Sequence, residues 1–122
     1  MDMKRDPVVY VIQDQQRWDD GQQKLVSKFN FESALTFGRI EFLLSPKAAP
    51  FNPESILKEM HAKLKHYSDA DHLVLVGNPA LIGWAVALAS LYNGGRVSVL
   101  QWSGREQRYI RIAASGLSAA QH

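Results

Sequence analysis

The sequence predicts an α/β domain with a mixed, mainly parallel sheet of four or five strands, two main helices and a C-terminal antiparallel hairpin. Three observations predict this class. Continuous apolar runs rich in β-branched residues occur at 8–12 and 72–76, as expected for strands covered on both faces. Two helix starts carry an Asn-Pro pair, at 52–53 and 78–79, which predicts an Asn N-cap followed by Pro at the first helical position in each. A Ser-Gly-Arg-Glu turn at 103–106 separates two further strand-like segments.

The first half of the chain contains two predicted strands. Residues 8–12 form the first strand, and residues 39–44 form the second. The polar segment 14–30 between them predicts a long loop with at most one irregular turn, and long loops are often functional. Residues 31–37 predict about two helical turns, which the following glycine ends.

The second half alternates helix and strand. The pattern predicts a helix over 53–66 with an apolar face, a strand over 72–76 and a second helix over 79–92. Strands over 96–102 and 107–112 then form the hairpin. Because a strand–helix–strand crossover of this length joins parallel strands, the sheet is mainly parallel and of the Rossmann-like type.

The helix over 79–92 has no polar face. A helix that is apolar all round is expected to be buried all round. The sheet and the first helix can cover two of its sides in a domain this small. Either the N-terminal half of the chain or a second copy must cover the rest, so we expect a homodimer through this helix if the N-terminal half does not reach it.

Composition excludes several classes of function. The 122 residues fit a single domain over 1–122, with flexible ends expected at 1–7 and 114–122. The absence of cysteine excludes disulfides and thiolate metal sites, and no signal peptide or membrane span is predicted, so we expect a cytoplasmic protein. No cofactor signature and no catalytic nucleophile–base set is recognisable, and the net charge of +2 is too small to indicate nucleic acid.

The turn that precedes the second helix is a candidate anion site. It lies where a strand ends and a helix begins, and there free backbone N–H groups and the helix dipole favour a phosphate. The candidate ligand-binding residues are Gly77, Asn78, Ala80 and Leu81. The segment lacks a GxGxxG or P-loop pattern, and a capped helix start explains the same residues without a ligand.

The C-terminal hairpin is a candidate interaction surface, because arginines stand beside aromatic residues there. Such a surface could stack on bases and contact phosphates. The residues concerned are Arg96, Trp102, Arg105, Arg108, Tyr109 and Arg111. Trp102 and Tyr109 could equally form a cross-strand pair, and alternating arginines also protect an edge strand from aggregation.

Two acidic segments are candidates for a metal or acid–base site. His72 follows Asp69 and Asp71, but nothing fixes the geometry that a metal requires, so no metal ligands are assigned. The other segment, 14–20, contains Trp18 among polar residues. That tryptophan either anchors the loop to the core or contacts a partner.

Three segments resemble a family of small proteins encoded by tailed bacteriophages. They are 31–38, 71–83, and 93–97 with its continuation through 100–102 and 105–110. The family usually has Asp at position 78 and Lys-Trp-Asp-Arg where this chain has Gln-Trp-Ser-Gly. Both departures remove an acid, which weakens any enzymatic interpretation. The resemblance implies a phage accessory protein made in a bacterial cytoplasm and carries no activity with it.

These observations favour a non-enzymatic accessory protein that binds a macromolecular partner, such as a host protein during host takeover or defence evasion. A nucleotide- or phosphate-binding domain that uses the 77–83 turn is the alternative. Nucleic-acid binding through the basic hairpin is the third hypothesis.

Overall fold

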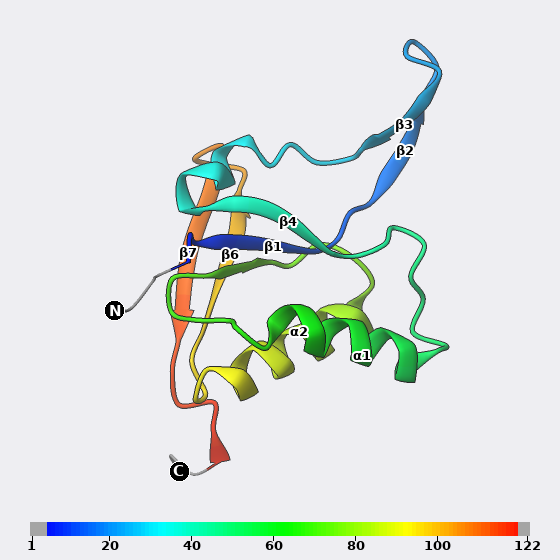
Figure 1. Ribbon diagram of the computed structural model, residues 1–122. Helices are drawn as coiled ribbons and strands as arrows, with labels where there is room; N and C mark the ends of the chain where they lie inside the picture. The colour runs from blue at the N-terminus through cyan, green and yellow to red at the C-terminus, as the bar shows by residue number, and fades with distance from the viewer. Residues whose placement is uncertain (1–4, 120–122) are drawn as a thin grey trace.

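The computed structural model describes residues 5–119 and contains the predicted mixed sheet. Five strands lie in the order β4-β1-β5-β6-β7, and two long helices pack on one side of them (Figure 1). The prediction of an α/β fold is therefore confirmed. The strands are β1 (Val8–Gln13), β4 (Arg39–Leu44), β5 (His72–Val74), β6 (Val97–Ser103) and β7 (Arg108–Ala114).

The strand order reverses beside β1. The chain passes from β1 to β4 on one side, and then returns to place β5 on the other side. Strands β4, β1, β5 and β6 are all parallel, and only β7 runs antiparallel, in the hairpin with β6. The carboxyl ends of the four parallel strands therefore meet at one edge, and such an edge is where open α/β sheets bind ligands.

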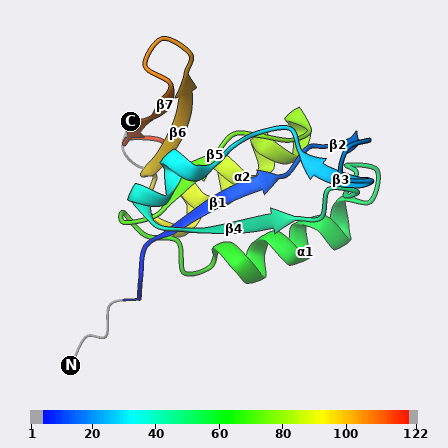
Figure 2. The same ribbon diagram turned by 90° about the horizontal axis from the view of Figure 1, so that it is seen from above.

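Both long helices cover the same face of the sheet, as Figure 2 shows from above. They are α1 (Pro53–Leu64) and α2 (Pro79–Tyr92). Alternate residues of β1 point into this layer, which explains why its apolar run is continuous rather than alternating. The helix-side core contains the fully buried side chains of Ile12, Met60, Leu64, Leu73 and Leu81.

The opposite face has a thinner cover. A short 3₁₀ helix, η1 (Glu32–Phe37), stands where two helical turns were predicted. Phe31 and Phe37 at its two ends pack on a small cluster. The buried members of this cluster are Val9, Val11, Ala34, Val74, Leu100 and Tyr109.

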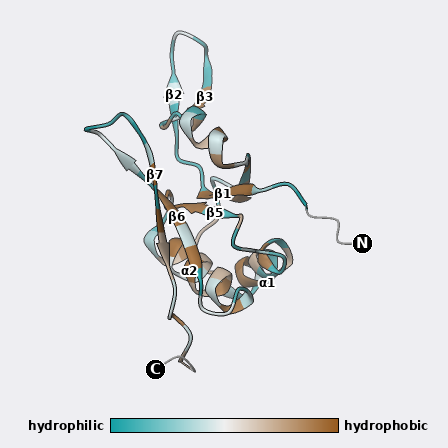
Figure 3. Cartoon of the chain, turned by 90° about the vertical axis from the view of Figure 1, so that its left-hand side faces the viewer, coloured by the Kyte–Doolittle hydropathy of each residue, from teal (hydrophilic) through white to brown (hydrophobic). Residues whose placement is uncertain are grey.

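The segment predicted as a loop over 14–30 is instead mostly a β-hairpin. Strands β2 (Gln16–Asp19) and β3 (Lys24–Ser27) pair with each other and form a separate sheet. The hairpin projects away from the main sheet in Figure 1, and Figure 3 shows it largely hydrophilic. The sequence does not predict these strands, because neither face of the hairpin is buried deeply enough to require alternating apolar and polar residues.

Helix α2 is buried on one side only, which corrects the expectation of burial all round. Its outer side exposes Gly83, Ala87 and Leu91, and the exposed fraction of Leu91 is 69%. The N-terminal half lies elsewhere, with η1 on the opposite face of the sheet (Figure 1). Within residues 5–119, the chain therefore does not provide the cover that the sequence led us to expect.

The two predicted Asn-Pro helix starts differ in their caps. At α2, the Asn78 side chain accepts a hydrogen bond from Ala80 N at 2.9 Å, as predicted. At α1, Asn52 makes no side-chain cap, so the prediction of an Asn cap is wrong there. Pro53 still occupies the first turn, and its fixed φ explains why the helix begins at this point.

A buried carboxylate lies at the amino end of the sheet and binds the surrounding backbone. Asp71 is fully buried and accepts hydrogen bonds from Val8 N and Ser68 N, each at 2.9 Å. The Arg5 guanidinium forms an ion pair with the same carboxylate. These contacts fix the start of β1 against the connection between α1 and β5. The flexible ends expected at 1–7 and 114–122 lie partly outside the described residues.

Candidate functional site

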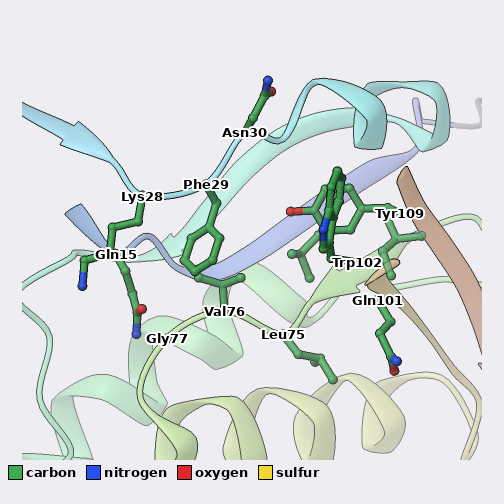
Figure 4. Close-up of a pocket in the computed structure, with 12 residues that line it drawn as sticks. Gln15, Lys28, Phe29, Asn30, Leu75, Val76, Gly77, Gln101, Trp102 and Tyr109 are labelled. Atoms are coloured by element: carbon green, nitrogen blue, oxygen red, sulfur yellow. The ribbon is translucent and has the colours of Figure 1, made fainter. Parts of the chain in front are cut away.

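A half-open pocket lies at the carboxyl edge of the sheet. Its volume is about 660 Å³, which is within the range of small-molecule sites. Two strand ends form one side, and the segment that leads from β3 to η1 forms the other (Figure 4). The lining residues are Gln15, Lys28, Phe29, Asn30, Val74, Leu75, Val76, Gly77, Leu100, Gln101, Trp102 and Tyr109.

One end of the pocket is aromatic. Trp102 packs edge-on against Tyr109 with ring centroids 5.2 Å apart, and these residues are cross-strand partners in the hairpin. Phe31 stacks on the Tyr109 ring at 6.4 Å and contacts Phe29 at 6.2 Å. The four rings form an arc with a buried middle, because Tyr109 is 4% exposed while Phe29 and Trp102 are 42% and 44% exposed.

The other end of the pocket is polar. Gln15, Lys28 and Gly77 lie together there, away from the Trp102 and Tyr109 rings (Figure 4). A backbone hydrogen bond of 2.7 Å from Lys28 N to the Gln15 carbonyl joins the two strands at the base of the β2–β3 hairpin. Lys28 is the single charged residue among those that line the pocket. The pocket therefore combines an aromatic end with a cationic end.

The predicted anion site at the 77–83 turn is largely satisfied by the chain itself. The Gln13 side chain fills the space beside Gly77, where an added Cβ would lie 2.6 Å from Gln13 Cβ. Gln13 Oε1 accepts a hydrogen bond from Asn78 N at 2.9 Å, and Gln13 Nε2 donates to the Ala48 carbonyl at 2.7 Å. With Ala80 N bonded to the cap and no N–H on Pro79, few donors remain. Phosphate binding at this turn stays a prediction.

The structure does not bring the candidate residues of the C-terminal hairpin together. Trp102 and Tyr109 line the pocket, and Arg105 and Arg108 lie at the hairpin end on the same edge. The Arg111 guanidinium instead donates to His72 Nε2 at 3.1 Å and to Ser98 Oγ at 3.2 Å. One basic surface across the hairpin is therefore not formed, and nucleic-acid binding there stays a prediction.

Arg96 is separated from the rest of this set. It lies just before β6, at the amino end of the strand, while Trp102 lies near the carboxyl end. Its guanidinium forms an ion pair of 3.0 Å with exposed Asp69. Arg96 therefore belongs to the connections at the opposite edge of the sheet from the pocket.

Trp18 lies on the projecting hairpin and not against the core. It is 53% exposed and pairs across the strands with Leu25, which is 54% exposed. Its indole N–H donates to Asp20 Oδ1 at 2.8 Å, which orients the ring. Ser27 Oγ donates to Asp14 Oδ1 at 2.7 Å and helps to attach the hairpin to the main sheet. The pair Trp18 and Leu25 is called the arm pair below.

His72 is buried on the thinly covered face. Its ring contacts Phe37 at 5.1 Å, and its Nε2 accepts the hydrogen bond from Arg111. Burial and the nearby Arg111 charge lower the pKa of His72. Nδ1 therefore carries the proton, and it has no hydrogen-bond partner among the described residues. Burial also raises the pKa of the Tyr109 hydroxyl.

The described residues contain no group of three His, Asp or Glu side chains placed to hold a metal ion. In the same part of the chain, no helix is long and apolar enough to cross a membrane.

The fold and the pocket define a small α/β protein with a ligand-sized cavity at the carboxyl edge of its sheet. The chain belongs to the Phage Pam3 gp32-like protein family, whose model matches residues 7–115. The resemblance to phage-encoded proteins is thereby confirmed. No curated protein and no solved structure matches the chain.

Of the twelve residues that line the pocket, only Gly77, Trp102 and Tyr109 are candidates from the sequence. Lys28, Phe29 and Asn30 come from the segment interpreted as a polar loop, and Gln15 comes from its start. The alternation of Phe29 and Phe31 around Asn30 was the available signal, because two rings in a polar segment must either pack or contact a ligand. Their position above the strand ends depends on long-range contacts that no local pattern shows.

Proposed function

We propose that this phage protein is a non-enzymatic accessory protein that binds a protein partner through the β2–β3 hairpin, in the cytoplasm of the host bacterium. The arm pair carries the proposal. Trp18 and Leu25 are neighbouring apolar side chains on a projecting hairpin, and each is more than half exposed. Tryptophan is enriched among the residues that dominate binding energy in protein interfaces.

The surroundings of the arm pair also suit a protein partner. Arg17, Asp19 and Lys24 alternate with the arm pair along the two strands, so the opposite face of the same hairpin carries charges of both signs. This mixture is less favourable for a nucleic acid, because binding of a polyanion requires an excess of positive charge. A host protein engaged during takeover or defence evasion is the partner class that fits a phage accessory protein.

Affinity capture from lysate of the host bacterium tests the proposal. The wild-type protein is compared with a Trp18→Ser/Leu25→Ser variant, and Leu117→Ser serves as a matched control on an exposed apolar residue that belongs to neither the hairpin nor α2. We expect one protein to be captured by the wild type and the control but not by the double variant, and to bind again after purification. Equal capture by all three proteins, or capture abolished by nuclease, would contradict the proposal.

A further inference from the structure

The pocket at the carboxyl edge is aromatic at one end and polar at the other. The proposed function does not involve this pocket. Trp102 and Tyr109 lie at its aromatic end, Gln15, Lys28 and Gly77 lie at its polar end, and Phe29 lies between the two (Figure 4). A ligand that fits both ends has a planar ring at one end and a negative charge at the other. We propose that the pocket binds a free nucleoside monophosphate.

The aromatic end suits a nucleobase. Phe29 and Trp102 stand at the two ends of the ring arc and keep close to half of their surface exposed, while the Tyr109 and Phe31 rings connect them. An aromatic face is favourable for stacking with any base. Asn30 and Gln101 also line the pocket, but their amides point away from the rings (Figure 4), so the pocket recognises the flat face of a base and no particular base edge.

The polar end suits a single phosphate. Lys28 is the one charged lining residue, and no carboxylate lines the pocket, so an anion meets no repulsion from the lining. Gly77 precedes the Asn78 cap of α2, so the positive end of the helix dipole lies on the same side of the pocket as Lys28. This places the anion beside the predicted 77–83 turn but outside the space that Gln13 fills.

Size and shape limit the ligand to a small one. A volume of about 660 Å³ is sufficient for a mononucleotide and is within the usual range for ligands of that size. The inference is independent of the proposed protein partner, because the arm pair does not line the pocket.

Isothermal titration with AMP, GMP, CMP and UMP tests the inference on the full chain. Two variants remove one end of the site each: Trp102→Leu keeps an apolar side chain without an indole ring, and Lys28→Gln keeps the length without the charge. Trp18→Leu and Lys24→Gln are matched controls, because they make the same changes on the projecting hairpin. We expect at least one monophosphate to bind, with affinity reduced about tenfold in each pocket variant and unchanged in the controls.

The ligand controls separate the two ends of the site. Inorganic phosphate and the free nucleosides should each bind at least about tenfold more weakly than the monophosphate, because each lacks one half of the contacts. Thermal unfolding of every variant checks that the fold is retained. The inference is overturned if no monophosphate binds, if both pocket variants bind like the wild type, or if an oligonucleotide binds more than tenfold tighter than the best monophosphate.

Discussion

The two faces of the sheet differ in how they are covered. The helix-side face carries α1 and α2 over a layer of fully buried aliphatic side chains. The opposite face carries only η1 and the segment before it, over a smaller cluster of buried residues. The pocket and the buried histidine lie on this second side, and the β2–β3 hairpin is continuous with its cover. We infer that the first face provides most of the stability and that the second provides the binding surfaces.

Truncation of a side chain on the helix-side face should have the largest effect. Met60 is fully buried between α1 and the sheet, so Met60→Ala is expected to reduce the free energy of unfolding by about 3 kcal/mol. Urea denaturation followed by circular dichroism measures this loss. By comparison, Phe29→Ala in the cover of the other face should cost less than about 1 kcal/mol, because that ring is 42% exposed. Equal losses would remove the contrast between the faces.

Removal of the buried carboxylate should have the next largest effect. Asp71→Ala leaves the N–H groups of Val8 and Ser68 without their acceptor and Arg5 without its ion pair. We expect a loss of about 2 kcal/mol in the free energy of unfolding. Asp69→Ala is the control, because this exposed residue pairs with Arg96 at the surface and should cost no more than about 1 kcal/mol. Equal costs for the two aspartates would contradict the structural role of Asp71.

Acid should weaken the thinly covered face through His72. Its pKa in the folded protein is below the ordinary 6.5, because burial and the Arg111 charge disfavour protonation. The unfolded chain therefore takes up a proton first as the pH falls. The contribution of His72 is fully present above about pH 6.5 and declines as the pH drops toward the lower folded pKa.

Substitution of His72 should remove this dependence. Chemical denaturation between pH 7.5 and 5 should show a flatter profile for His72→Gln than for the wild type. His66→Gln is a suitable control, because His66 is exposed on the same chain. An unchanged slope in His72→Gln would show that other groups cause the loss in acid.

The smallest effect on stability is expected on the outer side of α2. This side remains uncovered within the described residues, and we propose that a second copy of the chain packs on it. Light scattering after size-exclusion chromatography should then give a dimer for the wild type and a monomer for Ala87→Glu. The free energy of unfolding of the Ala87→Glu monomer should fall by no more than about 0.5 kcal/mol for the substitution itself. A wild-type monomer at high micromolar concentration would contradict the dimer.

The sequence predicts the helix-side half of this molecule better than the other half. Continuous β-branched runs predict the buried strands, and Asn-Pro pairs predict the helix starts. These elements depend on the local conformational preferences of their residues and on burial. The β2–β3 hairpin carries no such signal, because exposed strands do not need an apolar alternation. For the same reason Trp18 was recognised as a candidate contact, but its pairing with Leu25 was not.

The candidate site was predicted only in part. Its location at the end of β5 follows from the strand–turn–helix pattern, and Gly77 does line the pocket. Gln13 fills the predicted phosphate position. No local sequence pattern predicts this role, because Gln13 and Asn78 are 65 residues apart in the chain. Lys28 and Phe29 reach the pocket by a similar long-range approach.

Amide hydrogen exchange of the free protein under native conditions tests the contrast between the two faces most directly. We predict that amides of β1, β5 and α1 exchange only through global unfolding. Amides over residues 15–37 should exchange through local opening. The free energy of this opening should lie well below the free energy of global unfolding, and Met60→Ala should not change it. If residues 15–37 instead exchange with the global free energy and follow Met60→Ala, the two faces form one cooperative unit and our account is contradicted.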